Sequence, residues 1–262
     1  VFGSYQEYGL LVLTTAMVLY AFQIYCDFDG YTNIACGAAQ VMGITLMQNF
    51  KRPYFAVNIK DFWSRWHISL TSWFRDYLYI PFGGNRKGTL RKQINVLIVF
   101  CVSGLWHGAS WNFVIWGAIH GLMQVVYNIF SDIKKKKTPS FSTKLRNGIL
   151  TFALVDFAWL FFRTASLQEV FAIFMQMTKD LGDFTDILEV LGDGDRNLLI
   201  LGLLILFLVD FVHEKGISIR DWVKKQEVWF RYLLYIGIIS ACIYLKIHAG
   251  LAGARQFIYF QF

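Results

Sequence analysis

Two histidines occupy positions where an imidazole could take part in chemistry. His107 lies in the stretch SGLWHGASW, directly after the apolar run INVLIVFCV, and His67 lies in the aromatic segment DFWSRWHISLTSWFRDYLY. If the flanking runs lie in a bilayer, an unpaired polar group there costs several kcal/mol, so a titratable side chain is a functional candidate by default. We therefore expect His107 to be functional, with a hydrogen-bonded structural histidine as the alternative. For His67 the alternative is an interfacial anchor beside tryptophans.

The surrounding residues restrict the reaction that such a histidine could serve. The sequence has no H-E-x-x-H pattern, no G-x-S-x-G turn and no phosphate-cradling glycine loop. An imidazole without a serine or cysteine nucleophile suits direct transfer, in which it removes the proton of an acceptor hydroxyl while that oxygen attacks an activated acyl group. Such general-base help is worth about 10²- to 10⁴-fold. Burial should lower the pKa of the ring from about 6.5 and keep it neutral.

Other ionisable residues could support this chemistry. Asp27 and Asp29, in QIYCDFDGYTN, follow a long apolar run. They would cap a following helix, or one of them would face an internal cavity and orient an imidazole or a substrate. Arg75 and Asp76 would bridge the membrane interface or position substrate. His120, in AIHG, is expected to be a helix-packing residue.

The composition indicates a membrane protein. Of 262 residues, 56% are hydrophobic and only 16% are charged, against about 25% in ordinary soluble domains. The formal charge of +7 does not indicate nucleic acid, because the Lys and Arg fall in short loops between apolar runs and not in a recognition motif. The four cysteines show neither C-x-x-C pairs nor metal-ligand spacing, so we infer no disulfide and no metal site.

Apolar runs of helical length are spread along the chain and predict an all-α, polytopic transmembrane bundle in one membrane-embedded domain, 1–262. The run 94–105 is too short to cross alone and stops at His107, as in a broken or re-entrant helix. The expected apolar segments are 8–25, 32–49, 94–105, 111–130, 148–162, 198–212 and 232–247.

The segment 61–79 is too polar to span a bilayer but is strongly patterned. At 100° per residue its aromatic side chains share one side of a helix, whereas Asp61, Arg65, Ser72 and Asp76 share the other. We therefore expect a single amphipathic, interfacial helix that ends at the turn sequence PFGGN.

Loop charges predict the orientation in the membrane. Residues 131–147 carry six Lys and Arg against one Asp, which places this loop in the cytoplasm by the positive-inside tendency. The stretch 163–196 is predominantly acidic and lies one span later, so we expect it outside.

Four motifs resemble the bacterial branch of the membrane-bound O-acyltransferase family, which includes alginate O-acetylation and teichoic acid D-alanyl transfer proteins. They are FQIYCDFDGYTNIACGAA, DFWSRWHISLTSWFRDYLYIPFGGNR, SGLWHGASWNFVIWGAIHG and the terminal QFIYFQF. The match is dense from about residue 20 to 121. Family members often have DFSGY where this chain has Asp29, and they begin with additional membrane helices, so we expect this chain to cover roughly the C-terminal half.

The resemblance implies a helical acyltransferase with a funnel through the bilayer, in which His107 is catalytic and His67 assists. The fit of PFGGNR and WHGASWNF to polysaccharide O-acetylation members favours acetyl as the acyl group. In this interpretation Trp66, Trp106 and Trp111 wall the site. Three charged residues would position substrate, namely Asp27, Arg75 and Asp76.

The resulting hypothesis is a multi-pass O-acyltransferase of the bacterial plasma membrane. It would move an acetyl or similar short acyl group from a thioester donor, either acetyl-CoA or an acylated carrier protein, to a polysaccharide hydroxyl or an intermediate acyl-transfer protein. No bound cofactor, metal or nucleic acid is expected, and membrane lipid is its surroundings. The alternatives are D-alanyl transfer to teichoic acid and a non-enzymatic component of polymer export or transport.

Overall fold

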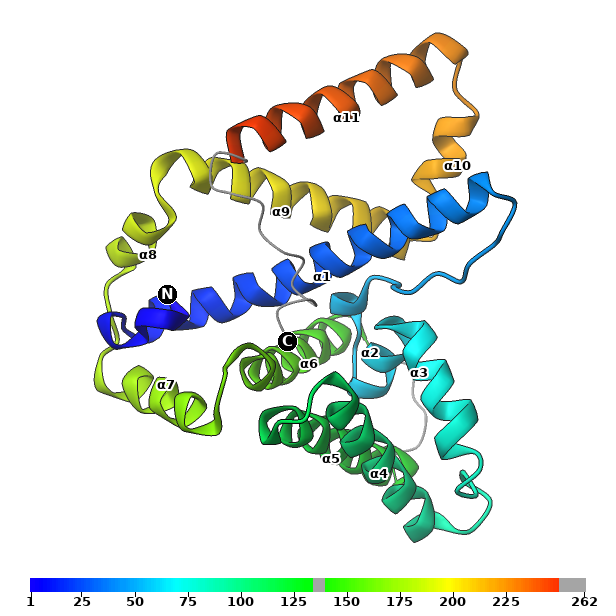
Figure 1. Cartoon of the computed structure of the whole chain (residues 1–262), viewed down its shortest axis with the longest axis vertical. Coiled ribbons are helices and arrows are strands. Elements are labelled where there is room, and N and C mark those ends of the chain that lie inside the picture. The colour runs from blue at the N-terminus through cyan, green and yellow to red at the C-terminus, as the bar shows by residue number, and fades with distance from the viewer. Residues whose placement is uncertain (134–139, 250–262) are drawn as a thin grey trace. The chain divides into compact units, whose positions relative to one another are not determined.

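The computed structural model describes residues 1–133 and 140–249, and these residues form helices and connecting segments without a β-strand (Figure 1). The Lys run 134–137 and the terminal motif QFIYFQF lie outside the described residues. The helices in chain order are η1 (Phe2–Glu7), α1 (Leu10–Val41), η2 (Pro53–Phe55), α2 (Ile59–Arg65), α3 (Ile68–Phe74), the π-helix η3 (Arg75–Tyr79), α4 (Thr89–His107), α5 (Trp111–Ile133), α6 (Phe141–Arg163), α7 (Leu167–Lys179), α8 (Phe184–Leu191), α9 (Asp193–Glu214), α10 (Ile219–Lys224) and α11 (Val228–Ala249).

Five of the described helices are long and apolar enough to span a membrane, which confirms the polytopic all-α prediction. They are α1, α5, α6, α9 and α11. The chain divides into two compact units, residues 1–193 and 194–262, and each is described by itself.

The first apolar region forms one helix, so the prediction of separate segments at 8–25 and 32–49 is wrong. α1 continues through Asp27 and Asp29, which therefore do not cap a following helix. The region contains no proline, and Gly30 costs a helix interior only about 1 kcal/mol, whereas a break would leave backbone groups unpaired at membrane depth. The helix ends later, where Gly43 takes a φ of +79° and its N–H donates to the carbonyl of Gln40.

α4 and α5 form a helical hairpin joined by residues 108–110, and Figure 1 shows them side by side. α4 extends over 19 residues, further than the predicted run 94–105, but it is not among the helices that qualify as spans. The helices approach closely because they meet at glycines. A Cβ on Gly117 would stand 2.1 Å from the carbonyl oxygen of Phe100.

The predicted single helix over 61–79 is wrong, because the chain breaks at Trp66 and His67. α2 ends at Arg65, and α3 begins at Ile68 with His67 as its N-terminal cap residue. The turn PFGGN does follow, and the side-chain amide of Asn95 on α4 donates to the carbonyls of Phe82 and Gly84 within it. Contacts from outside the segment therefore decide its path, and they are not visible in its own periodicity.

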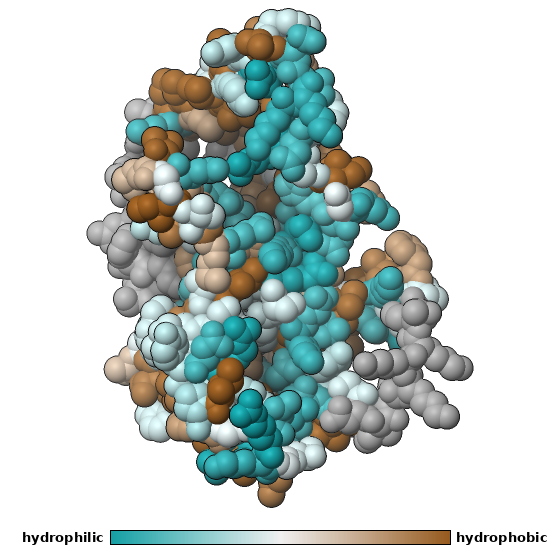
Figure 2. Space-filling model, turned by 90° about the vertical axis from the view of Figure 1, so that its right-hand side faces the viewer, coloured by the Kyte–Doolittle hydropathy of each residue, from teal (hydrophilic) through white to brown (hydrophobic). Residues whose placement is uncertain are grey.

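In the second unit, α9 and α11 carry almost no buried surface, with 6% and 0% of their most apolar windows buried. Their exposed side chains are mostly Leu, Ile, Phe and Tyr. The face of the molecule drawn in Figure 2, by contrast, is mostly hydrophilic, with hydrophobic side chains only in scattered places. The exposed apolar side chains of α9 and α11 are stable when bilayer lipid surrounds them.

Candidate active site

His67 occupies a strained turn between two short helices. Its φ and ψ of 44° and 54° lie in the left-handed region, which costs a residue with a side chain roughly 1–2 kcal/mol. Two backbone hydrogen bonds hold the turn against the preceding loop. The N–H of Lys51 donates to the carbonyl of Arg65 over 2.9 Å, and the N–H of Ile68 donates to the carbonyl of Asn49 over 2.9 Å.

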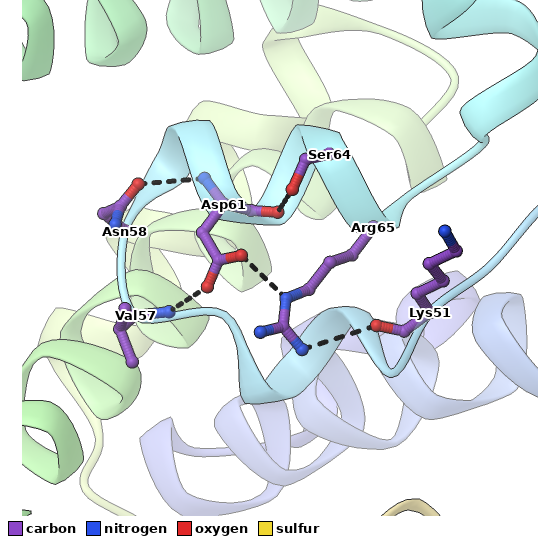
Figure 3. Close-up of polar contacts among 6 residues, drawn as sticks. All are labelled: Lys51, Val57, Asn58, Asp61, Ser64 and Arg65. Carbon is purple, nitrogen blue, oxygen red and sulfur yellow. Dashed lines mark hydrogen bonds and ion pairs between the residues drawn. The ribbon is translucent and has the colours of Figure 1, made fainter. Parts of the chain in front are cut away.

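A polar network fixes α2 to that same loop (Figure 3). Asp61 accepts a hydrogen bond from the N–H of Val57 over 3.0 Å and pairs with Nε of Arg65 over 2.7 Å. Asn58 caps the helix by accepting from the N–H of Asp61 over 2.8 Å. Arg65 also points a guanidinium nitrogen at the carbonyl of Lys51, 3.5 Å away. These contacts join the loop to the N-terminal end of α2 and, through Arg65, to its C-terminal end, two residues before His67.

The side chain of His67 is held on two sides. Its Nδ1 lies 3.2 Å from Oδ1 of Asn49, and its ring meets Phe28 of α1 edge-on, with ring centroids 4.7 Å apart. Burial and, to a smaller extent, the nearby His107 lower the pKa of His67 to about 3. The two imidazoles therefore lie within electrostatic reach of each other.

His107 is the last residue of α4, and its ring lies among aromatic rings. Its centroid is 5.0 Å from Trp106, 5.3 Å from Trp116 and 5.1 Å from Phe162. Burial lowers the pKa of His107 to about 4, as expected, so the ring is neutral at pH 7 and able to accept a proton. The side chain is only partly exposed.

Two glycines, one on either side of His107, allow this placement. A Cβ on Gly108 would stand 2.6 Å from the ring of Phe113, so only glycine lets α5 begin so close to His107. Gly104 and Gly108 thus both lie where a side chain would collide with Phe113.

The three predicted wall tryptophans occupy different surroundings. Trp66 is fully buried and packs against Trp159 and Phe50, at 5.0 and 4.9 Å between ring centroids. Trp106 contacts the ring of His107 but is 58% exposed, and Trp111 is 73% exposed. The structure thus places Trp66 in the core, and it places Trp106 and Trp111 at the surface of the hairpin.

The predicted substrate-positioning residues are not brought together. Asp27 is half-buried in α1, one residue from the Phe28 that touches His67. Arg75 and Asp76 are exposed neighbours that form a bidentate ion pair with each other, with their shortest contact at 2.7 Å.

His120 is fully buried, in agreement with a packing role. Its ring lies 5.0 Å from Trp63 and 4.9 Å from Trp116 between centroids. Trp116 therefore touches both His107 and His120.

A cavity of about 630 Å³ opens between α2, α3 and the α4–α5 hairpin. Lys60 and Lys92 supply positive charge to its lining, whereas Arg75, which also lines it, is paired with Asp76. Ser103 also lines it, one helical turn before His107. An anionic ligand bound in this cavity would therefore extend toward Ser103, close to the C-terminal end of α4.

The sequence reasoning missed three residues. Asn49 and Ser69 surround Nδ1 of His67, and Asp156 is a buried carboxylate within the span α6. An acidic residue inside an apolar run was a readable signal for Asp156. Nothing local in the sequence marks Asn49, because its contacts are with residues 18 and 20 positions away.

Comparison with known proteins places these features in a family. Residues 4–168 match the membrane-bound O-acyltransferase family, MBOAT, over more than half of the chain. The chain belongs to the MBOAT family. The matched region includes both His67 and His107, and the hairpin that carries His107 is therefore part of the MBOAT match.

Relatives of this MBOAT chain are named for the O-acetylation of peptidoglycan and alginate and for D-alanyl transfer to teichoic acid. It is 41% identical to the peptidoglycan O-acetyltransferase of Helicobacter pylori over 158 residues, which are 60% of this chain and 30% of that protein. It is 43% identical to the probable alginate O-acetylase of Pseudomonas fluorescens over 149 residues, 57% of this chain and 29% of the relative. It is 34% identical to the teichoic acid D-alanyltransferase of Bacillus subtilis over 163 residues, 58% and 41% respectively. The chain thus spans less than half the length of each relative.

Proposed function

We propose that this chain carries the acyl-transfer site of a multi-pass bacterial plasma-membrane O-acyltransferase. The enzyme moves an acetyl group from a thioester to a hydroxyl of a cell-envelope polysaccharide, or of an intermediate acyl-transfer protein. The observation that carries this proposal is the ring of His107 at the end of α4, held among the rings of Trp106, Trp116 and Phe162. The O-acetyltransferase relatives support acetyl as the acyl group.

His107 acts as the general base. Its neutral ring takes the proton of the acceptor hydroxyl as that oxygen forms a bond to the thioester carbonyl carbon. The carbon–sulfur bond then breaks, and the proton passes from the imidazolium to the leaving thiolate, so that an ester and a thiol are formed. A base with a pKa of about 4 is unprotonated at neutral pH, but it drives proton transfer less strongly than one near 7. His67 assists at the same site.

The donor is acetyl-CoA or an acylated carrier protein, both of which carry phosphate. The cavity between α3 and α4 supports this donor, because its lining combines Lys60 and Lys92 with hydroxyl side chains, among them Ser103. Cations in a partly enclosed cavity attract an anionic partner and speed its association.

The test uses the gene that encodes this chain in a strain that lacks its own envelope acyltransferase. Wild type, His107→Ala and a matched control, His213→Ala on α9, are expressed to equal levels. Ester-linked acetate on the surface polymer is then measured. We expect ester with wild type and with the control, and a loss of about 100-fold or more with His107→Ala.

The outcomes separate the alternatives. Wild-type ester levels with His107→Ala would defeat the base assignment. Ester-linked D-alanine in place of acetate would support the D-alanyl transfer suggested by the B. subtilis relative. Polymer export restored without any ester would favour the transport reading.

A further inference from the structure

Asn49 lies between the long helix α1 and η2, and its side chain is buried, with 7% exposed. Its Oδ1 meets three polar atoms of the His67 turn. These are the backbone nitrogen of Ser69 at 3.1 Å, Oγ of Ser69 at 2.9 Å and Nδ1 of His67 at 3.2 Å. One side-chain atom therefore organises both the backbone after His67 and the ring itself.

These contacts determine the orientation of the amide. A backbone N–H can only donate, so the Asn49 atom that faces the nitrogen of Ser69 is the carbonyl oxygen and not the amino group. That oxygen has only lone pairs to offer. The His67 nitrogen that faces it must therefore carry the proton.

Ser69 offers the one competing arrangement. Its Oγ lies 3.4 Å from Nδ1 of His67 and could donate its proton there, which would favour the opposite tautomer. The hydroxyl has a single proton, however, and its contact with Oδ1 of Asn49 is shorter, at 2.9 Å. The shorter contact takes the proton, and Nδ1 is left facing an acceptor.

We propose that Asn49 is a positioning residue that holds His67 as the Nδ1-protonated tautomer, so that Nε2 is the only basic nitrogen of that ring. The functional consequence of this inference rests on the proposed acyl transfer. In that reaction Nε2 accepts a hydrogen bond from the acceptor hydroxyl or from His107. Asn49 also anchors the strained backbone of His67, because its own carbonyl accepts from Ile68. One residue of a distant loop thus sets both the tautomer and the orientation of the ring. In metal-binding histidines, the hydrogen-bond partner of the second ring nitrogen commonly has the same effect.

Direct observation of the tautomer tests this without any assay of activity. The full-length protein is labelled with ¹⁵N-histidine, placed in lipid nanodiscs, and its ring nitrogens are assigned with the help of His67→Gln. We expect Nδ1 of His67 to be protonated and Nε2 to be unprotonated at pH 7. Protonation on Nε2 in the wild type would overturn the proposal.

Variants then test the role of Asn49. Asn49→Leu keeps the size but removes the acceptor, and we expect mixed tautomers together with a fall in kcat of about 10- to 100-fold at little changed KM. Asn49→Asp keeps the acceptor and should retain the tautomer, with the pKa of His67 raised by about one to three units. Ser69→Ala should leave the tautomer unchanged. A purely Nδ1-protonated His67 in Asn49→Leu would also overturn the proposal. Loss of the Nδ1-protonated tautomer in Asn49→Asp would overturn it as well.

The matched control is Asn112→Leu, which removes a buried asparagine whose side chain donates to the carbonyl of Thr164. It should reduce stability without changing the His67 tautomer. If the wild-type tautomer is as expected but the protein transfers no acyl group, the positioning role stands and the proposed function fails, so the two failures are distinguishable.

Discussion

Gly104 of α4 lies directly against the backbone of Phe113 of α5, so closely that a Cβ on Gly104 would stand 2.1 Å from the carbonyl oxygen of Phe113. This contact lies one turn before His107 and sets the separation of the two helices at the point where the candidate base projects. The hairpin also places Trp116 of α5 against the ring of His107. The end of α4 is therefore held by packing against the first turns of α5.

Gly104→Ala should destabilise the protein by about 1 to 3 kcal/mol, because the clash is with backbone and cannot be relieved by a rotamer change. The measurement is the thermal unfolding midpoint in detergent, with acyl transfer measured in parallel. The control is Gly37→Ala in α1, where a Cβ meets nothing within 4 Å. That control should be neutral or slightly stabilising, and equal midpoints for the two variants would contradict the close approach.

The pH dependence of kcat/KM should follow the lowered pKa of His107. A base whose pKa has fallen to about 4 stays unprotonated throughout the neutral range and is lost only as pH falls through 4. We expect constant kcat/KM from about pH 8 to pH 5.5, then a decline. An acid limb near the ordinary value of about 6.5 would contradict burial of the ring.

The lowered pKa of His107 also makes the free energy of unfolding depend on pH. Between about pH 6.5 and 4 the unfolded imidazole binds a proton while the folded one stays neutral, so stability falls as pH is lowered across this window. Circular dichroism at each pH, together with return to pH 7, separates reversible titration of activity from unfolding.

Asp61→Ala should lower stability by about 1.5 to 3 kcal/mol, since it removes a charged acceptor from both Val57 and Arg65. The comparison variant is Asp76→Ala, which breaks the exposed pair with Arg75 and should leave the unfolding midpoint nearly unchanged. Chemical denaturation of both variants provides the measurement. Similar losses for the two would show that the network in Figure 3 contributes no more than a surface ion pair.

Lys60→Gln should raise the KM for an anionic acyl donor several-fold at low salt with little change in kcat, because Lys60 lines the cationic cavity. Added salt should raise the wild-type KM in the same direction, since screening becomes strong as the Debye length falls to about 10 Å. Lys225→Gln in the second unit is the control. A KM that depends on neither Lys60 nor salt would exclude this cavity as the donor site.

Local features indicate the close packing around His107 but not two of the rings that it touches, Trp116 and Phe162. Glycines at 104 and 108 beside tryptophans indicate close packing around a histidine, and the structure has both. The membrane-spanning character of α5, α6, α9 and α11 was likewise visible in runs of apolar residues. These properties depend on residue type within one or two helical turns.

Long-range contacts determined what the sequence did not reveal. The helical periodicity of 61–79 is real, yet the backbone turns at His67 because Asn49 and Lys51 bond to it from an earlier segment. Asp27 and Asp29 resembled a cap because they follow an apolar run, but the helix continues through them. A single sequence carries no record of such partners.

The length of α1 bears on how deep the site lies. Its 32 residues extend about 48 Å, against roughly 30 Å for the hydrocarbon layer. If the helix enters that layer at Leu10, twenty residues of it reach Asp29 at the opposite margin, and a tilt of about 20° changes this by only a few ångströms. Phe28 would then bring His67 to the boundary between lipid tails and water, where a soluble polymer's hydroxyl could reach it without itself entering the membrane interior.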